Sequence, residues 1–306
     1  MAKAAQTVAK DSFQKEFCKR FESLCGKHSR WEIWSDFVQL SAVAVSNAVD
    51  KSNFERREEL YMTIAKKYTS AEMNVFSEML GNMVSSLDAN PDQDFLGHLY
   101  MGLNLGNDHA GQFFTPYSVC QCMAAMSNPT TTLKAQIQER GWVAVNDPAC
   151  GAGATLIAFA SECRKQGIDY QRSVLFTGQD IDYTVGLMCY LQLSFLGCPG
   201  YVTIGDTLLH PATSYDGNAL LPVPNDNIWY TPFYFRDVWH YRRLWAQLNI
   251  ALRVPAAPQP DETASITEAV PEAVEPMPEP EPAPAPAPAP VILKYEETAA
   301  GQLSFF

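Results

Sequence analysis

The sequence lacks the long apolar run that a membrane-spanning helix requires. Hydrophobic residues make up 47% of its 306 residues, yet they never form an uninterrupted stretch of about eighteen. The N-terminal segment "MAKAAQTVAKDSFQKEF" also lacks the apolar core of a secretory signal. We therefore expect no membrane partner and a cytoplasmic location.

The C-x-x-C spacing typical of zinc and redox sites is missing as well. The eight cysteines include no C-x-x-C, and the five histidines cluster with none of them. This pattern argues against a zinc site and against a disulfide framework. It favours reduced cysteines and predicts no metal.

The sequence has no basic surplus. Its net charge is −12. From residue 256 onward nine acidic residues face one lysine, which leaves 25 acidic and 21 basic residues in the rest. Nucleic-acid-binding domains usually carry a basic footprint. Charge alone therefore gives no support to DNA binding, although the segment "RDVWHYRRLW" (236–245) is a local basic patch.

A helical region is predicted over residues 1–110. The capping-box spacing of Thr69 and Glu72 opens the apolar stripe of "TSAEMNVFSEMLGNMV". An earlier stripe at helical spacing is followed by Gly26, which is placed to end a helix. Its members are Phe13, Phe17, Phe21 and Leu24.

The pattern changes to alternating strands and helices between about 140 and 210. The strands are "WVAVNDP", "SVLFTGQDI" and "GYVTIGDTL", and the helices between them are "ATLIAFASECRKQG" and "DYTVGLMCYLQLSFLG". Strands that alternate with helices predict parallel βαβ crossovers, hence an α/β, Rossmann-like sheet within a domain over 111–250. Only about 45 residues follow "GDTL" before the prolines begin, and "NALLPVP" offers one short further strand at best. The sheet is therefore expected to be truncated.

A proline-rich tail follows the predicted domain. From Pro255 to the end the chain holds 12 of its 21 prolines, many of them in "PEPEPAPAPAPAP". Such a composition cannot bury a core. We expect a disordered, extended tether over 255–300.

A turn of small residues separates the first strand from its helix in "VNDPACGAGATLIAFA". Gly151 and Gly153 remove side chains where a nucleotide-like ligand approaches the backbone and the helix N-terminus. Structural turns use glycines too. However, Asp180 ends the second strand, where a carboxylate can accept hydrogen bonds from ribose hydroxyls, and Asp206 follows the third strand at the same edge. Asp182 is placed to cap the next helix.

These segments resemble a known family. "NDPACGAG" is similar to the D-P-A-C-G-S-G motif of adenine-specific (N6) DNA methyltransferases, especially the modification subunits of type I restriction systems. "GQFFTP" (111–116) resembles the family's G-x-F-[FY]-T-P, and "DFLGHLYMGL" resembles the helix before it. The resemblance covers about residues 90–210. It implies an S-adenosylmethionine-dependent methyltransferase fold, S-adenosyl-L-methionine as cofactor, DNA as substrate, and a specificity or catalytic partner subunit in restriction-modification.

The resemblance also implies roles for individual residues. Thr115 and Pro116 are expected at the methionine end of the cofactor, although a helix N-cap followed by a first helical proline explains the pair equally well. Asp180 is expected to hold the ribose and Asp206 to contact the adenine ring. The turn beneath the cofactor is expected to comprise Asp147, Ala149, Gly151 and Gly153.

The family's acceptor motif, [DNS]-P-P-[FYW], is not found intact. That motif holds a flipped-out adenine by its amine and stacks on the base. The nearest segment is "WYTPFYF", in which Tyr230, Thr231, Pro232 and Phe233 would stand in without the amide or carboxylate acceptor. A helix capped by Thr231 and begun by Pro232 explains the segment as well. Asn225 is another conceivable acceptor, with the wrong spacing to an aromatic residue.

The chain ends in a five-residue peptide that resembles the Q-L-[SD]-L-F signal by which bacterial proteins dock on the sliding clamp. Its residues are Gln302, Leu303, Ser304, Phe305 and Phe306. Two terminal phenylalanines could instead fold back on the body. An extended tether of this length reaches on the order of 100 Å, which suits the presentation of a short peptide.

Two functions follow from the sequence. The first is a SAM-dependent adenine-N6 DNA methyltransferase with an unusual acceptor motif. The second is a catalytically silent SAM-binding module, tethered to the clamp, that regulates or blocks DNA modification.

Overall fold

The structure is a computed structural model that describes residues 9–105, 114–127, 130–253, 295–297 and 303–305. The chain divides into two compact units, 1–255 and 256–306. In the second unit, β5 (Tyr295–Glu297) pairs antiparallel with β6 (Leu303–Phe305). The remainder of the predicted tether lies outside the described residues, as do Gln302 and Phe306 of the predicted docking peptide.

Helices fill the N-terminal part of the first unit, as the sequence predicts. Thr69 and Glu72 form the capping box at the start of α5, and Gly26, at φ +112°, follows the end of α2. Within the described residues, no helix is both long enough and apolar enough to cross a membrane. The helices are α2 (Ser12–Leu24), α3 (Arg30–Val49), α4 (Phe54–Ala65), α5 (Ser70–Ala89) and α6 (Phe95–Gly102).

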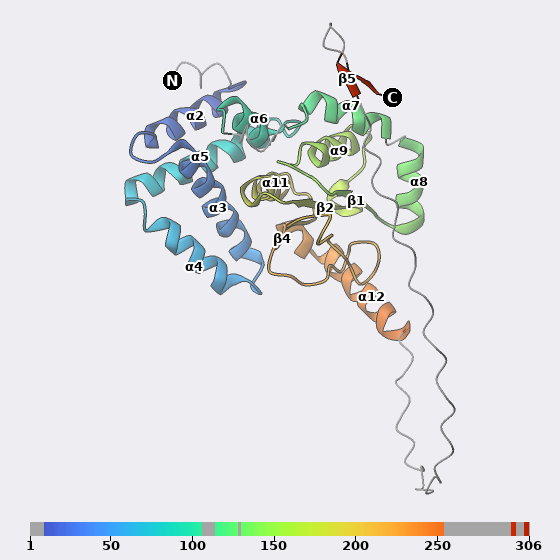
Figure 1. Ribbon diagram of the computed structural model, residues 1–306. Helices are drawn as coiled ribbons and strands as arrows, with labels where there is room; N and C mark the ends of the chain where they lie inside the picture. Colours follow the sequence, from blue (N-terminus) through green and yellow to red (C-terminus); the bar gives the residue numbers. More distant parts are fainter. Residues whose placement is uncertain (1–8, 106–113, 128–129, 254–294, 298–302, 306) are drawn as a thin grey trace, which may run out of the picture. The chain divides into compact units, whose positions relative to one another are not determined.

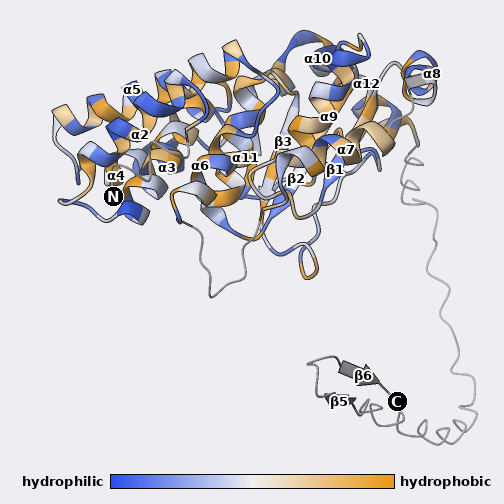
Figure 2. Cartoon of the chain, turned by 90° about the horizontal axis from the view of Figure 1, so that it is seen from above, coloured by the Kyte–Doolittle hydropathy of each residue, from blue (hydrophilic) through white to orange (hydrophobic). Residues whose placement is uncertain are grey.

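A parallel sheet lies beside these helices (Figures 1 and 2). Its strand order is β1-β2-β3-β4, and β1 to β3 are parallel. This confirms the predicted βαβ crossovers. The strands are β1 (Val143–Asp147), β2 (Val174–Asp180), β3 (Gly200–Ile204) and β4 (Ile228–Tyr230), with α9 (Ala154–Lys165), α10 (Tyr170–Ser173) and α11 (Tyr183–Phe195) between the parallel strands.

Helices cover both faces of the sheet. Val174 and Phe176 of β2 belong to the large core cluster that includes residues of α9, α11 and the N-terminal helices. Leu175 and Tyr201 point to the other face and pack in a second cluster with Trp239. Trp239 lies on α12 (Asp237–Arg253), which follows the short 3-10 helix η2 (Pro232–Phe235). Two further helices, α7 (Tyr117–Ser127) and α8 (Thr130–Arg140), precede β1.

The fourth strand differs from the sequence prediction. "NALLPVP" forms no strand; it contributes only an isolated bridge between Ser214 and Pro222. Instead β4 pairs antiparallel with β3. Arg57, only 2% exposed, donates to the carbonyl of Ile228 at 2.7 Å and lies 4.1 Å from the centre of the Trp229 ring. This hydrogen bond joins residues 171 positions apart and holds the helical region to the edge strand. No local sequence pattern predicts it.

Arg57 forms a buried ion pair. It donates to the Asp50 carboxylate at 2.6 Å, and both side chains are almost fully buried. Burial by itself would raise the pKa of Asp50, but hydrogen bonds from Ser52 and Arg57 outweigh it and lower the pKa. Breaking such a buried pair from one side is strongly destabilising.

Candidate functional site

The small-residue turn between β1 and α9 forms the floor of the candidate site. Gly151 and Gly153 have φ values of +55° and +94°, a region that side chains rarely adopt. A Cβ on Gly153 would also lie 2.8 Å from the sulfur of Cys189 on α11. Backbone conformation thus requires both glycines of the predicted motif, and close helix packing adds a second requirement at Gly153.

Asp147 shapes this turn with both carboxylate oxygens. Its Oδ1 accepts from the Ala149 N–H at 3.1 Å, and its Oδ2 accepts a very short hydrogen bond from the Thr155 hydroxyl. Asp147 therefore holds the end of β1 against the first turn of α9. The geometry gives it a positioning role.

Asp180 joins the end of β2 to the same turn. Its Oδ2 accepts from the Gly151 N–H at 2.8 Å, and its Oδ1 accepts from the Asp182 N–H at 3.0 Å. Burial raises the pKa of Asp180; the two backbone hydrogen bonds oppose that effect, and the nearby charges of Asp182 and Asp147 add to it. Asp182 caps α11 through the Val185 N–H, as predicted.

The end of β3 reaches this edge too. The hydroxyl of Thr207 donates to the carbonyl of Pro148 at 2.5 Å, which places "GDTL" against the turn. Asp206 Oδ1 accepts from the N–H groups of Leu208 and Leu209 at 2.8 and 3.1 Å. The three predicted carboxylates at the strand ends are therefore brought together at one edge of the sheet.

Phe114 adds a wall that the residue predictions omitted. Its ring lies 3.5 Å from where a Cβ on Gly151 would be, and it stacks on Tyr100 with centroids 5.4 Å apart. Thr115 and Pro116 follow, both exposed. The Pro116 carbonyl accepts the first hydrogen bonds of α7, so the helix begins one residue later than the N-cap interpretation predicts. Residues 111–113 of the predicted motif lie outside the described residues.

Gln192 is a second residue that the sequence reasoning missed. This fully buried side chain donates to Asp94 Oδ1 and to the carbonyl of Ala152, both at 2.8 Å, and accepts from the Leu96 N–H at 3.0 Å. It thereby connects α6, α11 and the glycine turn. The signal in the sequence is a glutamine inside the largely apolar run "YLQLSF".

Large apolar side chains stand exposed at the rim of the site. Ile181 lies between two acidic residues and is 69% exposed, and Leu208, directly after "GDT", is 91% exposed. Single exposed apolar residues are common on proteins. Here they follow the carboxyl ends of β2 and β3, where a flat apolar ring would contact them.

The predicted acceptor segment lies elsewhere. Tyr230 pairs with Tyr201 at the amino end of β3, whereas the site lies at the carboxyl ends. Thr231 is fully buried; its hydroxyl donates to the Cys198 carbonyl at 2.7 Å and accepts from the Gly200 N–H at 3.0 Å. It makes no side-chain cap, although a 3-10 turn does begin at Pro232. The structure therefore does not bring the segment 230–233 to the site.

Asn225 lies nearer to the sheet edge that carries the site, because β4 runs antiparallel to β3 and the turn before β4 adjoins the carboxyl end of β3. There the Ile204 N–H donates to the carbonyl of Asn227 at 3.0 Å. The Oδ1 of Asn225 accepts from the Asn227 N–H at 2.8 Å, within an exposed local turn just before β4. The amide oxygen of Asn225 therefore accepts a hydrogen bond from within its own turn.

The electrostatics of the site favour a cationic ligand. The turn and the two neighbouring strand ends carry four carboxylates, those of Asp147, Asp180, Asp182 and Asp206. A dinucleotide would bring its pyrophosphate to the helix N-terminus at this turn, close to those carboxylates. A ligand with positive charge in place of the pyrophosphate is the better match.

A family model matches the part of the chain that carries the site. The model of the N-6 DNA methylase family matches residues 92–255, which is more than half of the chain. A search of curated proteins finds no match. Among solved structures, the chain is similar to a Listeria monocytogenes protein assigned to the class I S-adenosylmethionine-dependent methyltransferases. The identity is 17% and the TM-score 0.37, over 70% of this chain and 57% of that one.

Proposed function

The chain belongs to the N-6 DNA methylase family, and from this we propose that it binds S-adenosyl-L-methionine (SAM) at the carboxyl ends of β1 to β3 and serves the methylation of adenine N6 in DNA. The observation that carries the proposal is the hydrogen bond from Gly151 to Asp180, which joins the glycine turn to the carboxylate of the next strand. Restriction-modification is the setting in which such modification subunits act, and we extend the proposal to it.

The residues at the turn fit SAM. When bound, SAM would supply a methyl group activated by its positively charged sulfonium; its amino group and its carboxylate offset each other, so the ligand is a net cation. The acidic edge suits this positive charge. Gly151 and Gly153 keep the floor free of side chains. Asp180 has each oxygen fixed by one backbone N–H, and each retains a lone pair for a ribose hydroxyl.

The other site residues are assigned to the adenine ring and to the methionine end of SAM. Asp206 has Oδ1 engaged with two backbone N–H groups, so we assign Oδ2 to the amine of the adenine ring. Ile181 and Leu208 would pack on the faces of that ring. Thr115 and Pro116 are proposed at the methionine end, because Phe114 places them beside Gly151.

The acceptor side of the reaction is proposed to come from a partner subunit. In doubly wound sheets of order 3-2-1-4-5-6 the ligand lies where the order reverses, between strands 1 and 4. The described residues form only the half that runs from β1 to β3, with β1 at the edge. A strand from another chain beside β1 would supply the groups that hold the adenine amine.

A second candidate is the silent SAM-binding module. The observation that favours it is the position of Tyr230 and Thr231 at the opposite end of the sheet from the site. Such a module would bind SAM without transferring its methyl group and would regulate or block modification by others.

The two candidates are separated by sequencing DNA for modified bases. We expect N6-methyladenine at a defined site when the chain is expressed together with its partner subunit in cells that lack adenine methylation, and none with Asp180→Ala. Unmodified DNA, together with SAM binding measured by calorimetry, would establish the silent module. Absence of SAM binding would overturn both.

We further propose that the terminal peptide docks on the bacterial sliding clamp. The proposal is supported by the order Gln302, Leu303, Ser304, Phe305 and Phe306, in which one polar anchor precedes apolar side chains. Deletion of residues 302–306 is expected to abolish binding to purified clamp in a surface plasmon resonance assay, while SAM binding stays unchanged. Retained clamp binding after the deletion would refute this role.

A further inference from the structure

Helix α12 is apolar on two opposite sides, and the described residues of the chain cover one of them. Trp239 and Ala246 face the sheet in the second core cluster. On the opposite side, large apolar residues recur at spacings of three and four. These residues, called here the outer stripe, are Tyr241, Leu244, Trp245, Leu248 and Leu252, and they are 69%, 47%, 66%, 48% and 75% exposed. A helix with an apolar stripe normally buries that stripe against another element.

The outer stripe is large enough to form an interface. A Tyr or Trp side chain offers about 150–250 Å² of surface, so two of them together with three leucines put on the order of 500 Å² of exposed surface on one helix. Monomeric proteins rarely expose more in one patch. A symmetric pair would bury on the order of 1,000 Å², the size at which specific interfaces begin.

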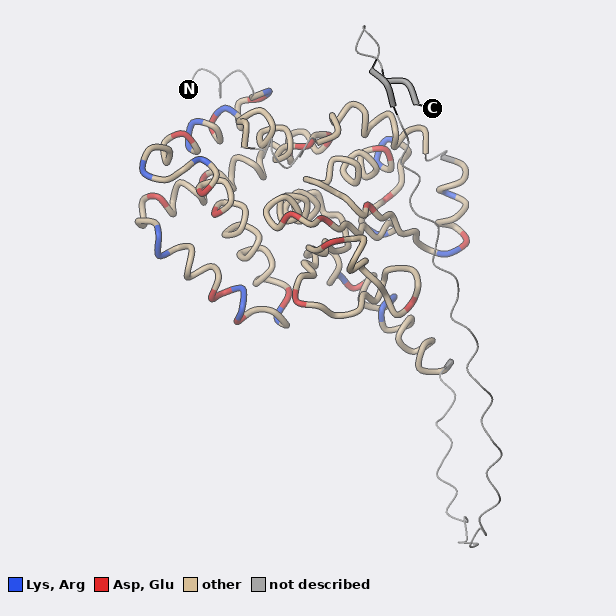
Figure 3. The backbone as a smooth tube through the Cα atoms, viewed as in Figure 1, with Lys and Arg blue, Asp and Glu red and all other residues tan. Residues whose placement is uncertain are grey.

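No charge interrupts the outer stripe. The basic residues Arg242 and Arg243 lie in the first half of α12, and residues 244–252 carry no charge (Figure 3). Arg243 is turned inward over the ring of Tyr234 at 4.2 Å. Association through the outer stripe therefore transfers no charged side chain of residues 244–252 from water into the interface. Such a transfer would oppose association.

The order of residues along the outer stripe is complementary to itself. Its aromatic residues lie toward the N-terminus of α12 and its outermost leucines toward the C-terminus. A twofold axis between Trp245 and Leu248 would place Trp245 against the partner's Leu248 and Tyr241 against the partner's Leu252. Twofold interfaces have this reciprocal form, in which residue i meets j and j meets i. We propose that the outer stripe binds a second copy of this chain, with the two α12 helices antiparallel.

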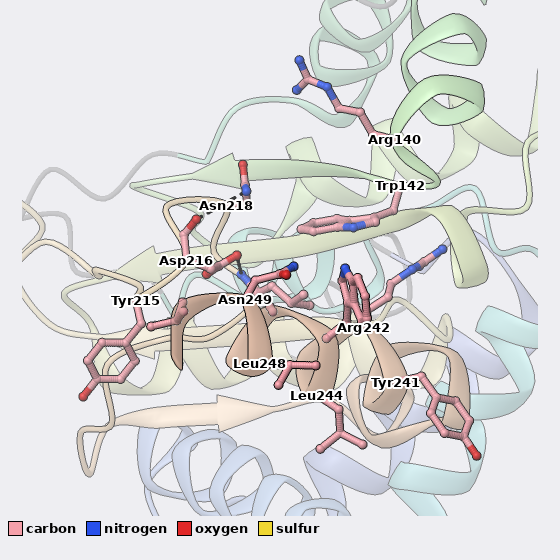
Figure 4. Close-up of a pocket in the computed structure, with 14 residues that line it drawn as sticks. Arg140, Trp142, Tyr215, Asp216, Asn218, Tyr241, Arg242, Leu244, Leu248 and Asn249 are labelled. Atoms are coloured by element: carbon pink, nitrogen blue, oxygen red, sulfur yellow. Dashed lines mark hydrogen bonds between the residues drawn. The ribbon is translucent and has the colours of Figure 1, made fainter. Parts of the chain in front are cut away.

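A groove lies beside the outer stripe. It has a volume of about 770 Å³ and is lined by Trp142, Tyr215 and Leu220 together with Leu244, Trp245 and Leu248 of the stripe. In Figure 4, Trp142 faces Asn249 and Arg242, whereas Tyr241 and Leu244 point away from Trp142. Tyr241 and Leu244 border the groove as well, so the outer stripe runs along its outer edge. This dimer is independent of SAM binding.

Opposite charges placed at the paired positions test the proposal. The wild-type chain is expected to sediment with twice the mass of one chain at concentrations on the order of 10 µM. Trp245→Lys or Leu248→Glu, each alone, should weaken association about 100-fold, because each sets a charge against an apolar partner. An equimolar mixture of the two variants should form a heterodimer, in which one site pairs Lys with Glu and the other is native.

Controls separate this contact from misfolding. Gln247→Lys changes an exposed residue off the stripe and should leave the dimer intact. All variants should keep the circular dichroism spectrum of the wild-type chain, because the substituted residues are exposed. A monomeric wild-type chain, or single variants that dimerise like it, would overturn the dimer. A mixture that stays monomeric would overturn the antiparallel pairing.

Discussion

Asp180→Ala is expected to weaken SAM binding by about 100-fold or more. Hydrogen bonds to a charged group contribute about 1.5–3 kcal/mol each, and two ribose bonds are lost together. The variant also leaves the Gly151 and Asp182 N–H groups without their acceptor, so the floor of the site is no longer held to β2. Isothermal titration calorimetry with SAM measures the effect directly.

A matched control shows whether the loss is local. Asp226→Ala removes a carboxylate that is 84% exposed and only 4.0 Å from Arg56, and it should leave the dissociation constant unchanged. Asp180→Asn should lie between wild type and Asp180→Ala, because the amide retains one acceptor oxygen. A dissociation constant for Asp180→Ala within threefold of the wild-type value would contradict the assignment.

The parts of the fold that depend on neighbours in sequence could be predicted. Thr69 and Glu72 are three residues apart and satisfy each other's backbone groups. The turn at Gly151 and Gly153 is likewise local, since positive φ values demand glycine there. Alternation of apolar runs then gave the parallel order of β1 to β3, because each crossover must return to the same sheet.

The parts that depend on distant partners could not be predicted. A three-residue strand such as β4 has too little pattern of its own, and its place is fixed by β3 and by Arg57. Thr231 followed by Pro232 has the local chemistry of a helix start, yet the hydroxyl of Thr231 is taken by the backbone around Gly200. A 3-10 turn does begin at Pro232 as the local pattern predicts, but tertiary contacts take the hydroxyl that would have capped it.

Gln192 is the clearest case, since its partners are up to 98 residues away. Gln192→Leu is expected to lower the free energy of unfolding by about 3–6 kcal/mol. The leucine leaves the Leu96 N–H and the Ala152 carbonyl buried without partners and removes one donor from Asp94, at about 1–3 kcal/mol each. Urea denaturation measures the loss. The same change at Gln136, an exposed position on α8, should alter stability by less than about 0.5 kcal/mol.

Gln192→Glu should lower the free energy of unfolding by an amount that depends on pH. Burial raises the pKa of Asp94 despite its hydrogen bonds from Gln192 and Gly97, and a second carboxylate beside it makes the pair take up one proton in the folded state. In the unfolded chain both carboxyls ionise near pH 4. The folded variant therefore holds more protons than the unfolded one above that pH, so its stability falls as pH rises.

The pH profile of the variant relative to wild type is the decisive measurement. As the pH falls from 8 to 5, the stability deficit of Gln192→Glu relative to the wild-type chain should shrink, because the shared proton restores a hydrogen-bond donor between residues 192 and 94. The deficit of Gln192→Leu should change less over the same range, since Asp94, which loses one hydrogen-bond donor, is then the one group of the pair that can take up a proton. Parallel profiles for the two variants would show that the side chain at 192 does not meet Asp94 as described, and that the glycine turn is held to α6 by other contacts.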